Sequence, residues 1–578
     1  MTRLRRQLMI IKLVKADKSD RIRVYLVEGY RDGKKVKQRI VKKYGNLQDL
    51  QKEDPDILDK LRAEAKRLSA VKKEDLIPMI IDMGKKNDAS STPLNIGCVY
   101  VSSLIDSLGM KAMFADIQKR ETFEYDLYEA MKFLTTMRIL HPGSKRESFR
   151  KKEELSLKFD LTLDDVYRCL SHLERHRPEI TRHLDRQMTE QYGRKKTLVY
   201  YDVTNYYFES NETSELREVG CSKQNSKHPI VTMGLYIDQD GYPISYDLFK
   251  GNVHDSKTLI PSFEKIRKEL AIEKCIIVAD KGLNSGTNIK YILESGNGYI
   301  FSSKIRGQAQ GLVEAALDEN DYVQIDKDFK YKQFQYRHKV AYQNEMGRTK
   351  SFEVTENLVV FYSADYDRKA KHEREQLLEK LEYYIDQPGR LKDKTHQGKF
   401  KYLKQEQYDA KTGEELNPKL RLKIDEDKVT EDAKLDGYYL IATNELSMAG
   451  TDIIRNYRGL WAIERSFRIL KSELEGRPIY LSTDEHITGH FFTCFMALLI
   501  ERILEKRIRD RFGDDEPVST EAIQEALRDM NVLKIENDIY KIMKYSPVQK
   551  KIQETFENGV IDKEYIRKEH LNQALKKV

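Results

Sequence analysis

The sequence predicts an α/β protein made of several domains, and three observations lead to this class. At 578 residues, the chain is too long for one hydrophobic core. Residues 95–192 carry the apolar periodicity of helices throughout. From residue 196 onward, short runs rich in β-branched and aromatic residues alternate with helical patterns, which is typical of a sheet covered by helices.

The amino-terminal region, residues 1–90, is predicted to be a basic β-hairpin arm followed by a helical connector. Two β-rich runs flank Asp32-Gly33 within residues 21–45, and this is a strong hairpin signal. The second run carries six cations, Lys34, Lys35, Lys37, Arg39, Lys42 and Lys43. A basic ribbon can lie along a DNA groove, but charged edge strands also arise to prevent aggregation, and both interpretations stay open.

Charge and composition favour a soluble protein with a polyanionic partner. Residues 1–50 contain 15 Lys or Arg and 5 Asp or Glu, a local charge of +10 on a chain whose total is +8. A basic arm on a near-neutral body suits a polyanion, although a merely solubilising tail has the same composition. The longest apolar run, residues 491–500, is too short to span a bilayer, and the first residues lack a signal-peptide cleavage site.

Five scattered cysteines without CxxC pairs predict neither a disulfide framework nor a zinc site, and they fit a reducing cytosol. HITGH, residues 486–490, has two histidines at i, i+4 but lacks the glutamate of a zinc protease motif, so a structural role is favoured. We therefore expect a cytoplasmic protein without a membrane segment.

Residues 91–194 are predicted to form a helical DNA-binding domain. Between its helical stretches lies a basic, turn-containing segment, residues 141–154. Such a segment could read DNA in the manner of a helix-turn-helix. An all-helical scaffold with a solvated charged loop explains the same pattern equally well.

The predicted catalytic core begins near Lys196. Three strand-like runs, a helix, a strand, a second helix and a further strand follow in order. Asp202 lies at the centre of the first strand and Asp280 ends the fourth, although either could be a plain edge or turn residue. This order resembles the ribonuclease H-like fold, in which the first and fourth strands are neighbours. The resemblance implies that the two aspartates lie together.

A third acid lies far downstream, in YRGLWAIERSFRILKSELEG (457–476). There Tyr457, Glu464 and Lys471 recur every seven residues, so on one helix they form a stripe along one face. A second stripe is apolar and is predicted to bury the helix: Ile463, Phe467, Leu470 and Leu474. The simpler interpretations are that Glu464 pairs with Arg468 at i+4, and that Tyr457 and Lys471 are ordinary solvated residues.

These residue types are the parts of a metal-dependent phosphoryl-transfer site. Moving a DNA phosphodiester requires activation of a water or a 3′-hydroxyl and stabilisation of the departing oxygen. Two divalent ions roughly 3.5–4 Å apart can do both, and two or three carboxylates can hold them. Magnesium prefers oxygen ligands and keeps several waters. A Lys or Tyr one or two turns from the acid can then bind flanking phosphates.

Together, the three motifs resemble those of the DDE transposases of bacterial insertion sequences, in the group with a Y-x2-R-x3-E-x6-K signature. Tyr457, Glu464 and Lys471 match the signature at the required spacings, whereas Leu460 occupies the arginine position. The segments around Asp202 and Asp280 resemble the first and second acidic motifs of the group, and the likeness extends from about residue 20 to 500.

The resemblance implies roles for each motif. Three acids are expected to be catalytic and to bind two Mg²⁺ or Mn²⁺ ions: Asp202, Asp280 and Glu464. Three further side chains are expected to position DNA phosphates: Tyr457, Lys471 and Arg468. Arg468 or Arg458 would also replace the arginine that Leu460 displaces from the signature.

The resemblance also divides the rest of the chain. A ribonuclease H-like core is expected from residues 195–306 and 436–482, interrupted by an inserted β-rich domain, residues 307–435, and followed by a helical C-terminal region, residues 483–578. In similar transposases the insertion helps to hold the DNA end, and some stack a flipped base on one of its aromatics. The only tryptophan here, Trp461, lies outside the insertion, so such stacking would need a Tyr or Phe.

The expected function is cut-and-paste DNA transposition in a bacterial cytoplasm. Its partners would be double-stranded DNA, as terminal inverted repeats and target, and a second copy of the chain. Two alternatives are a nuclease with the same core that cuts without joining strands, and a catalytically silent DNA-binding protein derived from a transposase.

Overall fold

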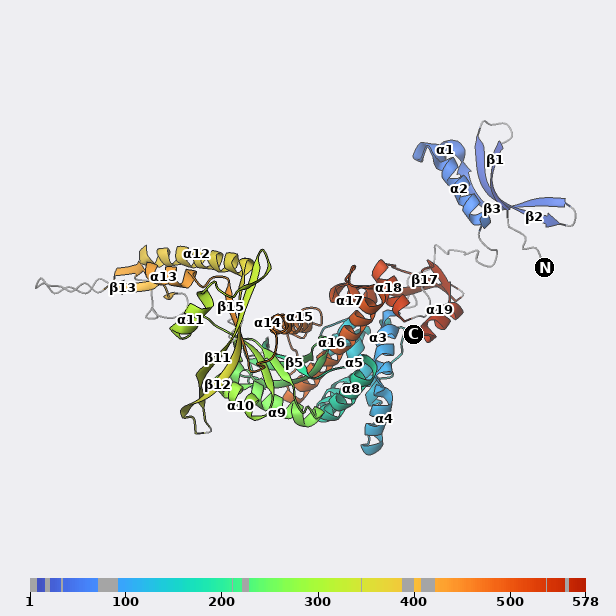
Figure 1. Ribbon diagram of the computed structural model, residues 1–578. Coiled ribbons are helices and arrows are strands. Elements are labelled where there is room, and N and C mark those ends of the chain that lie inside the picture. Colours follow the sequence, from blue (N-terminus) through green and yellow to red (C-terminus); the bar gives the residue numbers. More distant parts are fainter. Residues whose placement is uncertain are drawn as a thin grey trace, which may run out of the picture. The chain divides into compact units, whose positions relative to one another are not determined.

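The structure is a computed structural model (Figure 1), which describes residues 8–15, 21–32, 35–70, 92–209, 211–220, 228–344, 346–386, 400–406, 421–536, 538–556 and 561–578. The chain divides into two compact units, Met1–Ala89 and Ser90–Val578. Each is described by itself.

The first unit is a three-stranded antiparallel sheet packed against a helix. Its elements are β1 (Leu8–Lys15), β2 (Ile22–Asp32), β3 (Lys35–Asn46), α1 (Leu47–Glu53) and α2 (Ile57–Ala70). The predicted hairpin is confirmed, because β2 and β3 pair antiparallel with Asp32 opposite Lys35, while residues 33–34 lie outside the described residues. Leu26 of β2 is buried against Ala65 of α2. The pattern did not predict β1, which pairs along the other side of β2.

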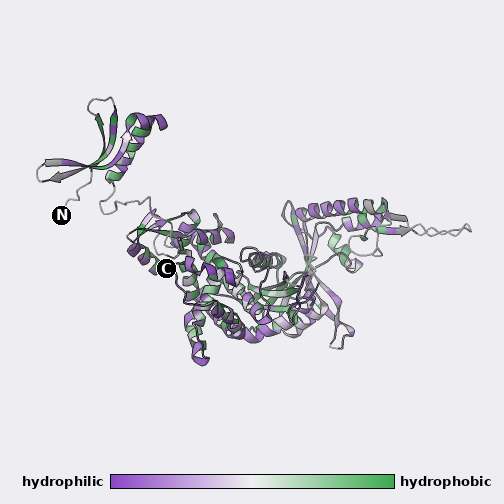
Figure 2. Cartoon of the chain, turned by 180° about the vertical axis from the view of Figure 1, so that it is seen from behind, coloured by the Kyte–Doolittle hydropathy of each residue, from purple (hydrophilic) through white to green (hydrophobic). Residues whose placement is uncertain are grey.

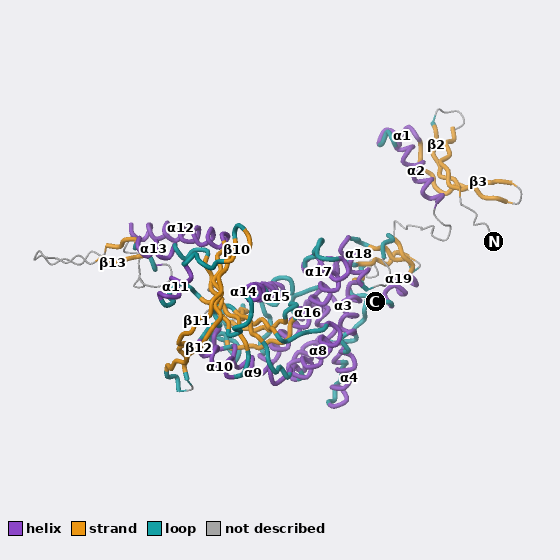
Figure 3. Tube along the Cα trace, viewed as in Figure 1, coloured by secondary structure: helices purple, strands orange, loops and turns teal. Residues whose placement is uncertain are grey.

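A nine-stranded sheet lies at the centre of the second unit, with helices on both faces (Figure 3). Its order is β10-β11-β12-β15-β9-β8-β5-β6-β7. The core strands are β5 (Leu198–Tyr207), β6 (Ile230–Asp238), β7 (Pro243–Lys250), β8 (Ile276–Ala279) and β9 (Gly298–Ser303). Strands β5, β6 and β7 pair antiparallel, whereas β5 with β8 and β8 with β9 pair parallel.

The predicted order of core elements is confirmed. After β7, a short turn of 3-10 helix (Asp255–Lys257) and α9 (Leu259–Leu270) precede β8, and α10 (Gly286–Glu294) separates β8 from β9. The first and fourth core strands, β5 and β8, are neighbours as expected. Helices α9 and α10 cover one face of the sheet, where Phe263 and Ile292 are fully buried.

The segment between the two halves of the core continues this sheet. The long hairpin of β11 (Phe329–Gln343) and β12 (Thr349–Ser363) pairs through β12 with β15 (Tyr438–Thr443), which in turn pairs with β9. Its other elements are β10 (Val323–Asp326), β13 (Leu403–Glu406), β14 (Arg421–Ile424), α11 (Gln310–Leu317), α12 (Ala364–Asp386) and α13 (Glu426–Ala433). Helix α12 is mostly hydrophilic (Figure 2).

Helices make up the region before the core, as predicted. They are α3 (Gly97–Ser107), α4 (Met110–Arg120), α5 (Leu127–Leu140), α6 (Lys145–Arg150), α7 (Leu163–Arg175) and α8 (Arg177–Tyr192). The basic segment 141–154 contains α6, but its first helical residue, Lys145, is buried with its ammonium 3.3 Å from His490 Nδ1. This cation therefore belongs to the core and not to a solvated loop.

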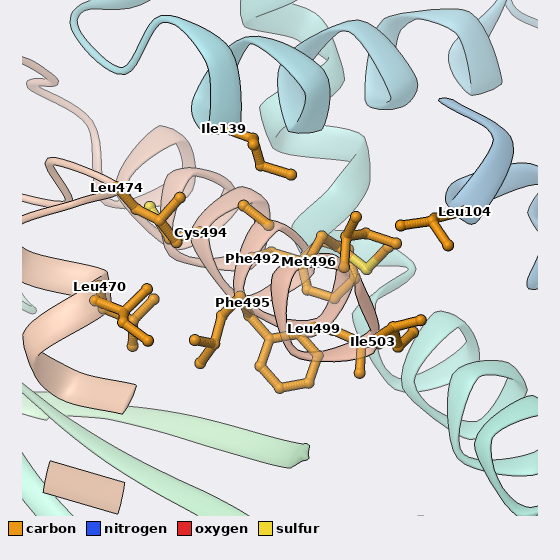
Figure 4. Packing of buried hydrophobic residues seen from close by; sticks show 14 of the residues in the cluster. Leu104, Ile139, Leu470, Leu474, Phe492, Cys494, Phe495, Met496, Leu499 and Ile503 are labelled. Atoms are coloured by element: carbon orange, nitrogen blue, oxygen red, sulfur yellow. The ribbon is translucent and has the colours of Figure 1, made fainter. Parts of the chain in front are cut away.

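Helix α16 (Asp484–Phe512) forms the axis of the helical core. Its side chains contact those of α3, α5 and α15 (Trp461–Lys471). Figure 4 shows Leu104, Ile139 and Leu470, one from each of these helices, turned toward α16. By length and composition, α16 is the only single described helix that could cross a membrane; the bent pair α3–α4 also passes. Because 94% of its apolar window is buried inside the protein, α16 is a core helix.

The C-terminal region, predicted to be helical, also contains a small antiparallel sheet. Its helices are α17 (Thr520–Asp529), α18 (Pro547–Thr555) and α19 (Lys568–Lys576), and its strands are β16 (Asn531–Glu536), β17 (Ile539–Ile542) and β18 (Tyr565–Arg567). Strand β4 (Leu94–Asn95) completes the sheet next to β16. The hairpin β16–β17 turns near Asp538, which has φ +61°. Aspartate is a common turn residue, so the sequence does contain a signal for this pair of strands.

Candidate active site

Asp202 lies in the middle of β5, half-buried, on the sheet face opposite α9 and α10. Side chains alternate between faces along a strand. Tyr201 and Val203 pack into the cluster under α9, whereas Tyr200 and Tyr206 pack into the cluster around α16. Asp202 is two residues from Tyr200 on the strand, so its side chain points to the same face, which α15 and α16 cover.

Asp280 follows β8 directly and extends the same face. Strands β5 and β8 are parallel, with Tyr200 opposite Val278. Continuing this register by two residues sets Asp280 beside Asp202, on strands about 4.8 Å apart. The Asp280 side chain is exposed, and its Oδ1 accepts a hydrogen bond of 2.7 Å from the backbone N–H of Gly282. The turn after β8 thus fixes this carboxylate at the strand end.

Glu464 lies on α15, which two contacts hold against the face that carries Asp202. At one end of the helix, the Lys471 ammonium donates a hydrogen bond to Thr204 Oγ1 on β5. At the other end, Gly459 lies so near β5 that an added Cβ would be 1.9 Å from the Tyr200 hydroxyl oxygen. Tyr200 and Thr204 flank Asp202, so α15 passes over this aspartate with Glu464 between the two anchors.

The hydroxyl group of Tyr457 lies near two of the three acids. Burial raises its pKa, and a hydrogen bond with Ser302 partly offsets the rise. The negative charges of Asp280 and Glu464 raise the same pKa further. Because Coulomb interactions weaken with distance, both carboxylates lie in the neighbourhood of this one hydroxyl group, although they are far apart in the sequence.

The prediction that Tyr457, Glu464 and Lys471 share one continuous helix is wrong. Tyr457 lies near the end of α14 (Gly450–Arg458), and α15 begins at Trp461. Between the two helices, the backbone hydrogen bonds change from the i−4 pattern of an α-helix to an i−3 pattern. The N–H of Leu460 donates to the carbonyl oxygen of Tyr457 over 3.1 Å. Glycine is a poor helix former, and at position 459 its missing side chain also permits the close approach to Tyr200.

The two arginines considered as substitutes for Leu460 lie on different surfaces. The Arg458 guanidinium lies 4.5 Å from the centre of the Phe329 ring, beside the inserted strands. Arg468 is exposed and lines the same cleft as Glu464. Within the described part of the chain, no ion pair of 4 Å or less joins Glu464 to Arg468, so the simpler pairing interpretation of Glu464 is not supported.

Glu464 and Arg468 open onto a cleft of about 720 Å³ between α15 and the C-terminal part of α16. Trp461, which is 57% exposed, forms another part of its wall. Arg465 also lines it but is engaged in an ion pair with Glu505. The cleft is wide and open, and its wall carries acids as well as cations, so its charge alone indicates no class of ligand.

A buried polar network that sequence reasoning missed holds α15 from behind. Arg502 of α16 donates to Ser466 Oγ over 3.0 Å and to Glu505 Oε2 over 2.8 Å. Nearby, burial raises the pKa of Glu501 to about 8, and this carboxyl group accepts a hydrogen bond from Gln524. The signal was present in the sequence, because ERILE interrupts an otherwise apolar helix with charges.

Two further buried groups fix the turn that follows α15. Arg138 of α5 donates to the carbonyl oxygens of Leu474 and Glu475, each over 3.3 Å. His490 Nε2 lies 3.3 Å from the carbonyl oxygen of Gly476. His490 therefore has the structural role that the sequence favoured for the HITGH histidines.

Comparisons with known proteins fit this geometry. The family model "Transposase DDE domain" matches residues 195–500, and the model "IS1634 family transposase, N-terminal domain" matches residues 10–75. A solved structure, the piggyBac transposase synaptic complex with hairpin DNA, is similar at 10% identity over 75% of this chain and 78% of that chain. The TM-score of this match is 0.31. No curated protein matches the sequence.

The DDE model covers more than half of the chain and includes all three predicted acids. The second model covers most of the first unit and its basic hairpin. The chain therefore belongs to the DDE transposases of insertion sequences, enzymes that cleave DNA and transfer the cut strand.

Proposed function

We propose that this chain is a cut-and-paste transposase in which Asp202, Asp280 and Glu464 are the catalytic acids. The observation that carries this proposal is the packing of α15 on β5, the strand beside which β8 runs. The parallel register of these strands brings two of the acids to one place. The anchors of α15 at Tyr200 and Thr204 bring the third acid over the same face.

The strand order supports a ribonuclease H-like core. Reading β7-β6-β5-β8-β9, three antiparallel strands are followed by two that run parallel to the first core strand. A crossover helix, α9, connects β7 to β8, and this places the end of β8 beside the centre of β5. An acid at each of these two positions is what the resemblance implies for Asp202 and Asp280.

The donor set fits Mg²⁺ or Mn²⁺. Asp202, Asp280 and Glu464 offer only carboxylate oxygens, which hard divalent ions prefer over the nitrogen and sulfur ligands that suit zinc. When bound, two such ions activate the attacking oxygen and stabilise the leaving oxygen of the phosphodiester. A strand, a strand-end turn and an anchored helix carry these three carboxylates.

Three side chains near the acids are proposed to position DNA phosphates. The Lys471 ammonium is oriented by its bond to Thr204 and by the Tyr206 ring, whose centre is 5.4 Å away. The raised pKa of Tyr457 keeps its hydroxyl protonated, so it can donate a hydrogen bond to a phosphate. Arg468 offers a planar fork of donors at the wall of the cleft.

The partners in this proposal are terminal inverted repeats, target DNA and a second copy of the chain, in the bacterial cytoplasm. The exposed cations of edge strand β3, including Lys37, Lys42 and Lys43, are proposed to bind the backbone of an inverted repeat. Binding that rests on phosphate contacts weakens steeply with salt. The helical region, residues 91–194, is proposed to contribute further DNA contacts.

The test uses the full chain with DNA that carries the ends of its own element. Asp202→Asn, Asp280→Asn and Glu464→Gln should each reduce Mg²⁺-dependent end cleavage below detection while leaving end binding largely intact. Glu294→Gln is the matched control, because Glu294 is exposed on α10 and, among the described residues, forms an ion pair only with Lys290 at i−4. If any of the three variants still cleaves as the control does, that residue is not part of the site.

Strand transfer separates this proposal from its alternatives. A nuclease with the same core would release ends without joining them to supplied target DNA. A silent DNA-binding descendant would bind ends and produce neither product. Joined product from the native chain, absent from all three acid variants, supports the proposal.

A further inference from the structure

Three potential metal ligands converge in the helical region, apart from the catalytic acids. One ligand atom each from Glu121, His172 and His176 lies within 4.8 Å of the other two. Glu121 directly follows α4, while His172 and His176 lie at the end of α7 and at the residue that follows it. This is the only such group among the described residues.

The local fold explains why these side chains meet. Residues at i and i+4 lie on the same face of a helix, and the backbone bond from His176 N–H to His172 O, 3.0 Å long, shows that the helical turn continues to His176. The Glu121 N–H bonds back to Ile117 O over 3.1 Å. Both helices thus end in a defined geometry that aims their last polar side chains at one point.

Two imidazole nitrogens in this group are buried and have no hydrogen-bond partner: His172 Nδ1 and His176 Nε2. His176 Nε2 lies 3.1 Å from Glu121 Oε1, but without the geometry of a hydrogen bond. Buried polar atoms are nearly always paired, so each unpaired one needs an explanation. A cation that accepts the nitrogen lone pairs and the carboxylate oxygen supplies it.

The surroundings hold the ligands in a suitable form. His176 Nε2 lies 3.1 Å from Glu121 Oε1, and Nδ1 lies 3.8 Å from Glu179 Oε2. When a cation takes the place of a proton on Nε2, Glu179 is therefore the carboxylate that faces the proton on Nδ1. The Phe123 ring lies edge-on to the His172 ring, with centroids 4.8 Å apart.

The helix dipoles favour a cation at this point on balance. The C-termini of α4 and α7 both end here, and each carries a partial negative charge. The N-terminus of α8 opposes this, but its first turn contains Glu179. Two nearby cations are each paired with a carboxylate: Arg120 with Glu179, and Arg175 with the proposed ligand Glu121.

We propose that Glu121, His172 and His176 form a structural site for one zinc-like transition ion that fastens the end of α4 to the α7–α8 junction. Ligands around tetrahedral zinc are about 3.3 Å apart at bond lengths near 2.0–2.1 Å, so the group must contract by about 1 Å or less per ligand. Water fills the fourth position. Two imidazoles distinguish the site from the oxygen-only catalytic acids, which suit Mg²⁺.

This site was not foreseen from the cysteines, whose scattering predicted no zinc site. That reasoning addressed thiolate ligands only. The His-x3-His pair at 172 and 176 has the same spacing as HITGH, and only the fold brings Glu121 beside it. In the HITGH pair, the buried His490 lies instead among the cations Lys145 and Arg138, which disfavour a metal ion.

The experiment uses the full chain, stripped of metal, in millimolar Mg²⁺ so that the catalytic carboxylates are occupied. Co²⁺ alone is the probe, because its visible absorption reports four-coordinate geometry, and Zn²⁺ then displaces it. We expect one equivalent of four-coordinate Co²⁺ per chain. His176→Gln should weaken its affinity by at least about 100-fold, and Glu121→Gln by about 10–100-fold.

His486→Gln, in the other histidine pair, is the matched control and should leave Co²⁺ binding unchanged. Zn²⁺ should raise the thermal midpoint of the native chain and of the control, but not that of His176→Gln. If His176→Gln fails to fold, Glu121→Gln decides, since its side chain is 33% exposed. The proposal is overturned if the native chain binds no four-coordinate Co²⁺, or if binding survives in the folded histidine or glutamate variant at native affinity.

Discussion

Replacing Gly459 with alanine tests whether α15 is positioned by its contact with β5. The backbone at this position, φ −59° and ψ −14°, suits alanine, so the change introduces no backbone strain. The new methyl group would lie 1.9 Å from the Tyr200 hydroxyl oxygen and 2.4 Å from its Cζ. Ordinary contact begins near 3.4 Å, so α15 or Tyr200 must move by about 1.5 Å.

The magnitudes favour activity over stability as the readout. Overpacking of this kind costs about 1–3 kcal/mol. For a unit the size of residues 90–578, each kcal/mol shifts the thermal midpoint by only about 1 °C. A displacement of about 1 Å at reacting groups can lower a rate by about 10²-fold. We therefore expect Gly459→Ala to reduce end cleavage by about 10²-fold, with a loss of about 1–3 °C in thermal midpoint.

The control is Gly311→Ala. Gly311 lies in α11, has no heavy atom within 4 Å of an added Cβ, and is not in the left-handed region. It should leave cleavage unchanged and stabilise the protein slightly. Tyr200→Leu should relieve the clash, so Gly459→Ala should cost much less in that background than in the native one. Native cleavage rates in Gly459→Ala would refute the reasoning that this contact sets the position of Glu464.

Three other predictions follow from the same site. Lys471→Met should lower cleavage by about 10²-fold at saturating DNA, measured by single-turnover kinetics, and Lys471→Arg should recover part of the loss. Equal rates in the native chain and both variants would remove Lys471 from the site. Arg468→Ala should weaken end binding and reduce its salt dependence by about one phosphate contact, measured by titration at several salt concentrations; an unchanged slope would contradict a phosphate contact. Burial raises the pKa of Glu501 from 4.5 to about 8, so the folded state holds this proton more tightly, and the associated stability is present below about pH 4.5 and is lost as pH rises to about 8. Glu501→Gln should therefore flatten the fall in thermal midpoint between about pH 5 and pH 8, and an unchanged pH profile would contradict the assignment.

The core could be predicted from the sequence because its signals are local. Asp202 and Asp280 lie on short apolar strands bounded by turns, and the order of these strands and helices limits the topology. The apolar positions Ile463, Phe467 and Leu470 are buried as the helical stripe predicted. The hairpin of β2 and β3 was indicated by Asp32-Gly33 between two β-rich runs.

Features that depend on contacts between distant segments could not be predicted. The break between α14 and α15 lies where Gly459 approaches Tyr200. The periodicity of apolar residues within one segment does not predict a contact of this kind with a distant strand. The pairing of β12 with β15 extends the core sheet into the insertion, and α12, two short strands and α13 lie between these two strands in the sequence. The hydrogen bonds that Arg138 donates to the turn after α15 likewise join segments that are remote in the sequence.

The central claim is that Asp202, Asp280 and Glu464 hold a pair of divalent ions. The most direct measurement is a structure of the full chain bound to a cleaved transposon end in Mn²⁺, with the ions located by anomalous scattering. We expect two manganese peaks roughly 3.5–4 Å apart, each bound by at least one of the three carboxylates. Manganese bound elsewhere, with these three side chains free of metal, would contradict it.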